Sequence, residues 1–539
     1  MSGPQASCRL RKAPSIRRGC PKKWRLRSGL FLANDNTTKR RRTQFGVVAD
    51  HLQSGAGGSR GLALFRKTIC NGARLVTPIH YLSATDLVRA YAEKKLSPVE
   101  VTRHVLDRIE CVDRKLNAFC LVDSDAALRD ARDSEARWMK GVPAGLVDGV
   151  PATIKDVVLT KGWPTLKGSR LSSTAGPWNE DSPATARLRE HGAVLLGKTT
   201  TPEFGWKAIG DSPLTGITRN PWSLEHTSGG SSAGAAAGLA AGMGALAVGS
   251  DGGGSIRIPA SFCGVAGIKP TLGRVPYFPP SAMSTLGHCG PMARTVEDVA
   301  LLLTVLSGAD PREAYSLPPF TGNFRDGIDA GVAGLRMALS LTLGYAQVDA
   351  EVRALVLAAA QRMQSLGAHV EEADPGFASP REAFDVLWKS GAANVVSQLP
   401  QDRLDLLDPG LAAAAQDGKR FSATDYVRAD FVRTDLGICL AKFHQKYDLL
   451  ITPTVGKPAL PVGTDISDRS VEREWIDWAP FSYPFNMTRQ PAATVPCGFT
   501  TSRLPVGVQI VGPLYSEALV LRAARAVETA QSYPWPALD

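Results

Sequence analysis

The longest uncharged stretch of the chain, residues 227–250, limits most strongly how the chain can fold. Its 24 residues would be enough for a helix that spans a bilayer. Seven of them are glycines and five are serines or threonines, however, and few have large apolar side chains. Because such residues offer little surface to lipid, the composition argues against a transmembrane helix. The stretch is predicted to be a buried, tightly packed segment.

Strands and helices are predicted to alternate on both sides of this stretch. Apolar runs at 150–158, 193–197 and 245–249 are typical of buried strands with helices between them. The alternation predicts an α/β fold with a mixed central β-sheet covered by helices on both faces. The other expected elements are a helix that begins with the capping box Ser97-Pro98-Val99-Glu100, a strand at 118–122, a helix at 125–139, strands at 449–452 and 506–511, and a mostly helical region at 310–445.

Composition limits the class of protein further. A chain of 539 residues with 44% hydrophobic and 21% charged residues can bury a large core. Its nine cysteines are scattered and form no Cys-x-x-Cys pair, which argues against a disulfide scaffold and a cysteine-based zinc module. This cysteine usage predicts a reducing compartment, and we expect a cytoplasmic protein.

The net charge of +11 is concentrated at the N-terminus. Residues 1–75 contain 17 lysines and arginines and only two acids, Asp35 and Asp50. The other 464 residues contain 45 bases and 49 acids, a net charge of −4. A slightly acidic domain has no general electrostatic attraction to phosphate backbones, so no specific nucleic acid is expected as a partner.

The basic N-terminal segment has several interpretations. A translocation signal would need an apolar stretch after Arg41-Arg42, but Asp50 and His51 interrupt it. An organelle transit peptide and a nucleic-acid-binding arm are compatible with the composition. We favour a disordered extension at 1–75 without a catalytic role, followed by a single catalytic domain at 76–539.

Two glycine-rich motifs flank the predicted strand at 245–249. Ser231 lies in the first and Ser255 in the second, 24 positions later. A phosphate-binding loop would need Gly-Lys-Ser/Thr, which neither motif contains. One glycine pair usually does no more than form a turn, but two serines behind paired glycines favour backbone N–H groups that converge on an oxyanion. The motifs are Gly229-Gly230-Ser231-Ser232-Ala233-Gly234 and Asp251-Gly252-Gly253-Gly254-Ser255-Ile256-Arg257.

A serine nucleophile needs a base, and the eight histidines offer no convincing one. His226 is nearest in sequence to the glycine motifs, but no local pattern brings its ring to either serine. A Gly-x-Ser-x-Gly elbow is absent around Ser255, which argues against an α/β-hydrolase arrangement. Lys155 lies near the end of the apolar segment 149–156, where desolvation is expected to lower the pKa of an amine. Taken alone, Lys155 would more often be a structural or surface lysine.

Together these three segments resemble the amidase signature family, whose members hydrolyse amides with a Ser–Ser–Lys triad. The resemblance covers residues 77–539 and is strongest over 228–274. Ser228 and Ala233 depart from the family pattern, which usually has Pro and Gly or Ser there, but neither removes a catalytic atom. Supporting segments are Asn220-Pro221-Trp222 and residues 261–271, 290–298 and 493–499.

The resemblance implies a role for each member of the triad. Ser255 matches the nucleophile, Ser231 the bridging serine and Lys155 the base. In the family the bridging serine follows a cis peptide, which here would follow Gly230. Ser231 would accept the proton of Ser255 and donate its own to Lys155. Neither a metal nor an organic cofactor is implied.

The resemblance also assigns the residues around the nucleophile. Asp251 and Arg257 match the family pattern, and we interpret them as an ion pair that positions the loop rather than as substrate contacts. The oxyanion of the tetrahedral intermediate would be stabilised by the backbone N–H groups of Gly252, Gly253, Gly254 and Ser255.

The C-terminal third contains a dense group of aromatic side chains. Such density is typical of a core, although some of these rings could line an acyl pocket together with Pro484, Asn486 and Gln490. Residues that contact the substrate are expected within 160–215, 310–445 and 470–490. The aromatic group comprises Trp475, Trp478, Phe481, Tyr483 and Phe485.

The expected activity is hydrolysis of the C–N bond of a small carboxamide through an acyl-enzyme on Ser255, with water as the second substrate. Aryl or apolar amides and carbamates are the expected substrates, no membrane partner is expected, and a homodimer is left open. One alternative is the A subunit of a tRNA-dependent amidotransferase, although the segment 478–486 resembles stand-alone amidases. A nucleic-acid-binding protein that uses residues 1–75 is the alternative from another class.

Overall fold

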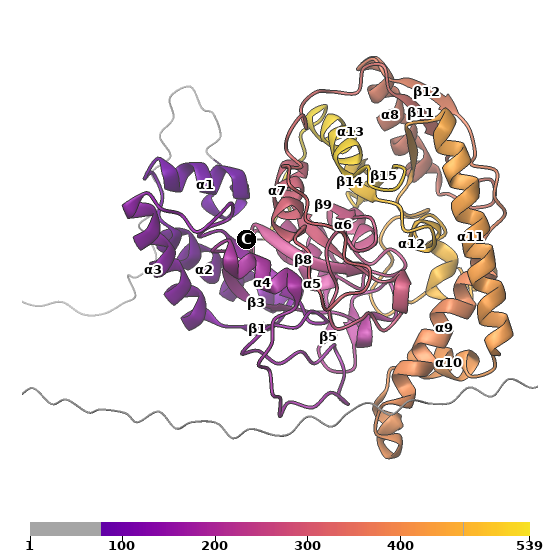
Figure 1. The fold of residues 1–539 in the computed structure, drawn as a ribbon, viewed down its shortest axis with the longest axis horizontal. Helices are drawn as coiled ribbons and strands as arrows, with labels where there is room; N and C mark the ends of the chain where they lie inside the picture. The colour runs from indigo at the N-terminus through magenta and orange to yellow at the C-terminus, as the bar shows by residue number, and fades with distance from the viewer. Residues whose placement is uncertain (1–76, 467, 539) are drawn as a thin grey trace, which may run out of the picture. The chain divides into compact units, whose positions relative to one another are not determined.

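A mixed β-sheet of 11 strands lies at the centre of the described part of the chain (Figure 1). The computed structural model describes residues 77–466 and 468–538, so the predictions for residues 1–75 lie outside the described residues. The strand order is β1-β3-β2-β8-β10-β9-β14-β15-β13-β11-β12. The strands are β1 (Phe119–Val122), β2 (Pro151–Lys155), β3 (Val194–Thr199), β8 (Leu246–Asp251), β9 (Ala266–Lys269), β10 (His288–Ala293), β11 (Arg336–Leu339), β12 (His369–Glu372), β13 (Leu449–Pro453), β14 (Ala492–Phe499) and β15 (Pro505–Val511).

The pairing of β2 with β8 determines where the predicted site residues meet. These strands are parallel, and Ile154 of β2 is in register with Val248 of β8. Their carboxyl ends therefore lie at the same edge of the sheet, one with Lys155 and the other with Ser250 and Asp251. β2 is also parallel to β3, whereas β8 pairs antiparallel with β10. Two short hairpins pair β4 (Asp211–Ser212) with β5 (Gly216–Ile217) and β6 (Arg219–Asn220) with β7 (Ser223–Thr227).

Helices cover both faces of the sheet (Figure 1). In one group α13 contacts α7 and α8, and these helices pack on β8, β9, β10 and β12–β15. In the other group α5 and α6 contact each other. α5 packs on β2, β3, β8 and β10, and α6 packs on β9, β14 and β15. The helices are α1 (Ala84–Ala92), α2 (Pro98–Leu116), α3 (Ser124–Lys140), α4 (Pro183–Glu190), α5 (Ala233–Ala240), α6 (Arg257–Cys263), α7 (Val296–Leu306), α8 (Ala350–Ser365), α9 (Arg381–Ser397), α10 (Pro409–Gly418), α11 (Ala423–Lys446), α12 (Tyr483–Met487) and α13 (Glu517–Thr529).

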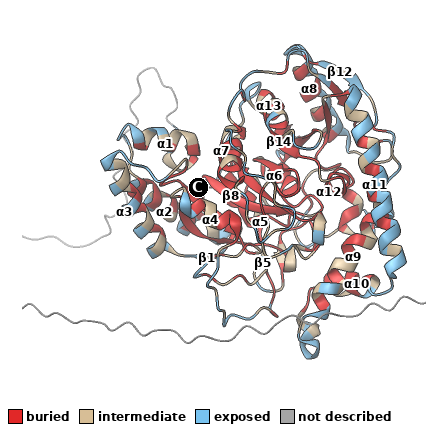
Figure 2. Cartoon of the chain, in the orientation of Figure 1, coloured by how far each residue is buried: buried red, intermediate tan, exposed pale blue. Residues whose placement is uncertain are grey.

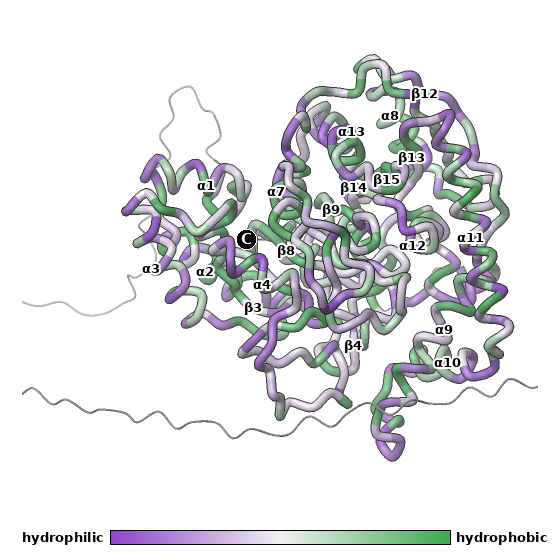
Figure 3. Tube along the Cα trace, in the orientation of Figure 1, coloured by the Kyte–Doolittle hydropathy of each residue, from purple (hydrophilic) through white to green (hydrophobic). Residues whose placement is uncertain are grey.

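The uncharged stretch is buried at the centre of this architecture (Figure 2). Every residue of α5 is buried, and so is every residue of β8. Small side chains make this possible, because a Cβ atom on Gly234 would lie 2.0 Å from the carbonyl oxygen of Ala118. Figure 3 shows hydrophobic residues along β8 and β9 and stretches of hydrophilic residues on outer helices such as α3 and α11. The segment is thus the packed core that its composition predicts.

Most of the predicted elements are confirmed, with small changes of boundary. α2 begins where expected, with Pro98 at its first turn and the side chain of Ser97 accepting a hydrogen bond from the backbone N–H of Glu100 at 3.1 Å. The predicted strands at 118–122, 150–158, 193–197, 245–249, 449–452 and 506–511 correspond to β1, β2, β3, β8, β13 and β15.

The prediction of a mostly helical region at 310–445 is wrong in part. Residues 310–335 form turns and irregular structure, and the parallel strands β11 and β12 follow within the same region. β12 is an edge strand of sequence His-Val-Glu-Glu without a buried residue, so it lacks the apolar run by which buried strands are recognised. β10 and β14 were not predicted either, because Gly and Pro interrupt their apolar sequences.

Among the described residues, no helix combines the length and the apolar composition that membrane crossing requires.

Candidate active site

The two serine motifs meet at the end of β8. Ser231 lies in the turn before α5, and the peptide bond between Gly230 and Ser231 is cis. The loop with Ser255 connects β8 to α6. The backbone N–H of Ser232 donates to the carbonyl of Ser255 at 3.0 Å, and the Ser232 hydroxyl donates to the carbonyl of Ser250 at 3.2 Å. These bonds hold the two serine loops against each other.

Lys155 projects into this junction from the end of β2. Its Nζ atom is 2.7 Å from the hydroxyl oxygen of Ser231 and 3.0 Å from that of Ser250. The side chain is fully buried, and burial lowers the pKa of Lys155 to about 7, although the charge of Asp251 acts in the opposite direction. Near neutral pH a large share of this amine is therefore unprotonated and able to accept a proton from a hydroxyl.

Ser255 lies beside the same junction, at the wall of a cavity. Ser231, Ser250 and Ser255 all line this cavity, whose volume is about 570 Å³. Within the described part of the chain, no hydrogen bond joins the hydroxyl of Ser255 to that of Ser231. The structure therefore brings the three predicted residues to one site and shows the Lys155–Ser231 contact, but not the second contact of the expected proton relay. Catalytic hydrogen bonds often tighten only when substrate is bound.

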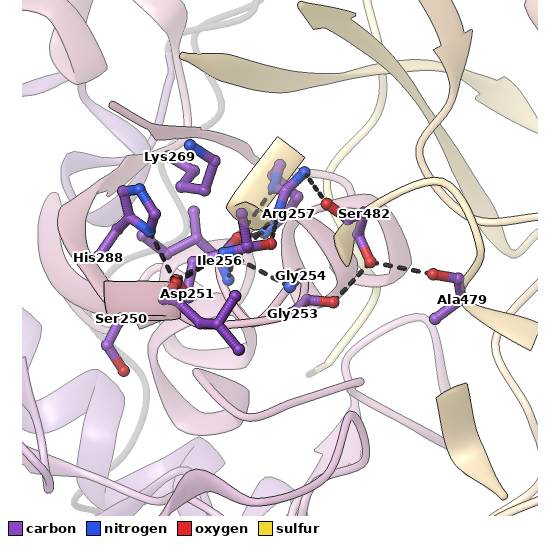
Figure 4. A network of polar contacts seen from close by, with 12 residues as sticks. Ser250, Asp251, Gly253, Gly254, Ile256, Arg257, Lys269, His288, Ala479 and Ser482 are labelled. Atoms are coloured by element: carbon purple, nitrogen blue, oxygen red, sulfur yellow. Dashed lines mark hydrogen bonds and ion pairs between the residues drawn. The ribbon is translucent and has the colours of Figure 1, made fainter. Parts of the chain in front are cut away.

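Asp251 and Arg257 form a fully buried ion pair beneath the Ser255 loop (Figure 4). The Nε and Nη2 atoms of Arg257 each lie 2.9 Å from a carboxylate oxygen of Asp251. The remaining donors of Arg257 reach the Ser482 carbonyl at 3.0 Å, the Gln509 side chain at 2.7 Å and the Asn486 side chain at 2.6 Å. The expected ion pair is present, and it joins the nucleophile loop to the C-terminal third of the chain.

Asp251 is held in its ionised form despite burial, whereas burial favours the neutral form of Lys155. Burial alone would raise the pKa of Asp251, but the charge and hydrogen bonds of Arg257, with a hydrogen bond from Asn486, hold it well below its usual range. Lys269 and His288 lie near the pair, and burial lowers the pKa of both groups well below their usual ranges (Figure 4). The Asp251 carboxylate is thus favoured in its ionised form in a region where burial disfavours the charged forms of Lys269 and His288.

One of the four N–H groups assigned to the oxyanion hole is already engaged. The backbone N–H of Gly254 donates to Asp251 at 2.8 Å (Figure 4). Those of Gly252, Gly253 and Ser255 form no hydrogen bond with any described residue. The set of expected donors is therefore reduced to these three, because a donor held by a buried carboxylate is not available to a developing oxyanion.

The walls of the cavity come from segments that the sequence only partly indicated. Lys167 and Phe204 lie in the expected range 160–215, and Trp388 and Leu399 lie in 310–445. No residue of 470–490 lines this cavity, and a wall segment at 277–287 was not expected. The aromatic group of the C-terminal third is instead buried in a core cluster, which fits the core interpretation: Trp475, Trp478, Phe481, Tyr483 and Phe485.

Sequence reasoning missed two hydroxyl groups at the site. Ser250 binds Lys155, and the phenol of Tyr277 interacts with the Ser250 side chain. Ser250 was detectable, because it follows the predicted strand at 245–249 directly. Tyr277 was not, because it lies in an irregular segment without a motif. The ring of His226 bonds Ser223 at 2.8 Å, so this histidine already has a local hydroxyl partner.

The arrangement has the components needed for acyl transfer. It combines a hydroxyl at a cavity wall, a second hydroxyl bound to a buried amine of lowered pKa, and unengaged backbone N–H groups beside the first hydroxyl.

Comparison with known proteins agrees with this chemistry. The model of the family described as Amidase matches residues 100–521. An acylamidase from Rhodococcus erythropolis is 36% identical over 85% of this chain and 96% of its own length. The A subunit of the glutamyl-tRNA(Gln) amidotransferase from Moorella thermoacetica is 35% identical over 84% of this chain and 98% of its own length. The crystal structure of a bacterial aryl acylamidase of the amidase signature family superposes with a TM-score of 0.79 at 31% identity, covering 85% and 98% of the two chains. The chain therefore belongs to the amidase signature family and is an amide-hydrolysing enzyme.

Proposed function

We propose that the chain is a serine amidase that hydrolyses small aryl or apolar carboxamides, with carbamates as further substrates, through an acyl-enzyme on Ser255. The contact of 2.7 Å between Lys155 and Ser231 is the observation that supports it most strongly. A buried amine whose pKa is near 7 can hold a proton during the reaction and return it afterwards.

In the proposed mechanism the proton moves along the three residues in sequence. Lys155 takes the hydroxyl proton of Ser231, and Ser231 takes that of Ser255 as the Ser255 oxygen attacks the amide carbonyl. The oxyanion would accept hydrogen bonds from the N–H groups of Gly252, Gly253 and Ser255. When the C–N bond breaks, the proton returns through Ser231 to the leaving amine. Water then attacks the ester by the same path, which releases the acid and restores Ser255.

The expected substrate class rests on the cavity and on the relatives. Most of the cavity wall next to Ser255 is apolar, with Phe204, Trp388 and Leu399 among its side chains, and its volume of about 570 Å³ suits a small molecule. One relative is an acylamidase, and a structural neighbour is an aryl acylamidase. An aryl or aliphatic amide would bury its apolar part against these side chains. The cytoplasmic location expected from the cysteine usage stays a prediction.

The experiment is an assay of the purified chain on anilides, aliphatic amides and carbamates, with no other protein, nucleic acid or nucleotide added. We expect anilides to be hydrolysed, and we expect the Ser255→Ala variant to be inactive on the same panel. An active Ser255→Ala variant would refute the acyl-enzyme. A wild-type chain that hydrolyses amides only after the other components of an amidotransferase are added would favour the alternative function, which the similarity to the Moorella protein suggests.

A further inference from the structure

Lys167 differs from the other lysines that the described part of the chain keeps away from solvent. Each of those has a protein partner for its ammonium or amine, whereas Lys167 Nζ forms neither a hydrogen bond nor an ion pair with a described residue. Yet Lys167 is partly buried and lines the cavity that also contains Ser231 and Ser255. The lysines with partners are Lys155, Lys198, Lys207, Lys269, Lys389 and Lys457.

The acidic group that acts on Lys167 already has other partners. Asp156 is the carboxylate that influences Lys167 electrostatically. It lies 3.5 Å from the ammonium of the fully buried Lys198 and accepts a hydrogen bond from the backbone N–H of Leu166 at 3.3 Å. Asp156 and Lys198 therefore compensate each other's charge, and Lys167 has no ion-pair partner among the described residues.

The other charged groups around the cavity are also balanced. Asp251 is paired with Arg257, and Lys155 loses its charge near neutral pH. Among the described residues that line the cavity, more are apolar than polar, and Lys167 is the one basic side chain. Its ammonium has no hydrogen-bonded or ion-paired partner among the described residues. Partial burial of a cation without a partner is unfavourable, and a ligand that brings an anionic group removes that cost.

The backbone around Lys167 is held in an unusual conformation. Lys167 has a φ angle of 57° and Phe204 one of 51°, a region that side chains other than glycine, Asn and Asp seldom adopt. The two residues are joined, because the N–H of Phe204 donates to the carbonyl of Lys167 at 2.7 Å. The N–H of Lys167 in turn donates to the carbonyl of Asp156 at 3.0 Å. These bonds fix the segment at the cavity wall, so the ammonium is presented from an ordered backbone rather than from a free loop.

We infer that Lys167 is a specificity-determining residue that binds a carboxylate on the substrate, so that the preferred substrates are amides with an apolar body and a carboxylate group. The inference rests on the proposed function, because it concerns the same cavity. It leaves the chemistry at Ser255 unchanged and adds one charge-assisted hydrogen bond to substrate binding.

Matched substrates test this selectivity. Acetanilide and N-acetyl-4-aminobenzoate differ by a carboxylate on the amine side, and butyranilide and succinanilate differ by one on the acyl side. We expect the wild type to prefer the carboxylate-bearing member of at least one pair by about tenfold or more in kcat/KM. Lys167→Met should reduce that preference to near unity, Lys167→Arg should retain most of it, and Lys167→Glu should reverse it. Lys161→Met, which removes an exposed lysine of the same segment outside the cavity, should leave the preference unchanged.

A binding measurement separates this inference from the proposed function. The dissociation constants of the same pairs are measured by calorimetry with Ser255→Ala and with Ser255→Ala/Lys167→Met, so the result does not depend on turnover. Tighter binding of the carboxylate-bearing member that Lys167→Met abolishes supports the inference. Equal binding of both members in both pairs, or a preference that survives Lys167→Met, overturns it. If the wild type hydrolyses the neutral anilides, the proposed amidase function is supported whichever result the binding measurement gives.

Discussion

Two fully buried ionisable groups, Lys155 and Asp251, lie at the carboxyl ends of the neighbouring strands β2 and β8, and they differ in whether burial removes their charge. Among the described residues, Lys155 Nζ has only neutral hydrogen-bond partners, the hydroxyls of Ser231 and Ser250 and the Ser250 carbonyl, so burial lowers its pKa to about 7. Asp251 is offered the guanidinium of Arg257, and it stays ionised at the same degree of burial.

The partners of a buried group, rather than burial itself, decide whether that group can exchange a proton near neutral pH. A fully buried lysine without a carboxylate partner, such as Lys155, can exchange a proton near neutral pH, which is what a general base requires. A carboxylate that accepts two hydrogen bonds from one guanidinium does not exchange a proton near neutral pH. It instead holds the adjacent loop in place. We expect removal of a group from the first site to affect mainly the rate, and removal of a group from the second to affect mainly stability.

The largest effects are expected at the Lys155 site. Lys155→Ala and Ser231→Ala should each lower kcat/KM on an anilide by about 10³-fold or more, and the double variant by little more, because the residues act as one unit. The circular dichroism spectrum should remain that of the folded protein. Near-normal rates in Ser231→Ala would show that this hydroxyl does not relay the proton.

The second effect is on stability and concerns the ion pair. Arg257→Met should lower the free energy of unfolding by about 3–5 kcal/mol, because it leaves the Asp251 carboxylate buried without its partner. Adding Asp251→Asn to that variant should recover part of the loss. Urea denaturation of the three proteins measures both changes. A loss below about 1 kcal/mol for Arg257→Met would contradict the assignment of this pair as a structural anchor.

A smaller, pH-dependent effect is expected from Lys155→Met. Between pH 7 and 10.5 the unfolded chain binds a proton at Lys155 that the folded chain releases, so wild-type stability should rise with pH in this window. Methionine does not titrate, so the stability of Lys155→Met relative to wild type should fall by about 1.4 kcal/mol per pH unit across that window. Thermal or urea unfolding of both proteins at pH 7 and pH 9 measures the difference. A gap that does not change with pH would mean that the folded chain keeps Lys155 protonated.

The smallest effect is expected from truncation at the N-terminus. Deleting residues 1–75 changes the formal net charge from +11 to −4. Every residue assigned to the site lies at position 155 or later, so kcat/KM on a neutral amide should stay within about twofold of the full chain. A folded but inactive truncated protein would show that this segment contributes to the site.

The sequence indicated the core of the site because its chemistry is local. The glycine motifs around Ser231 and Ser255 and the apolar run before Lys155 each lie within a few residues, and β8 holds the two motifs at a fixed separation. The same holds for α2, whose cap and apolar face are visible in the sequence.

The remaining features depend on contacts between distant segments. Tyr277 and Trp388 reach the cavity from irregular structure and from α9, and no local pattern places them there. The hydrogen bond from the Gly254 N–H to Asp251 depends on the conformation of the loop, which residue types alone do not reveal. β12 could not be predicted from an apolar run, because an exposed edge strand need not be apolar.

Direct titration of Lys155 tests the central claim. The protein is labelled with ¹³C- and ¹⁵N-lysine, the Lys155 signal is assigned by its loss in Lys155→Met, and its chemical shift is followed by NMR from pH 5 to pH 11. We expect a midpoint near pH 7, because Lys155 is buried beside neutral hydroxyls, and a kcat/KM that rises with pH through the same midpoint. A midpoint near 10.5, with Lys155 protonated throughout the range in which the enzyme is active, would contradict it.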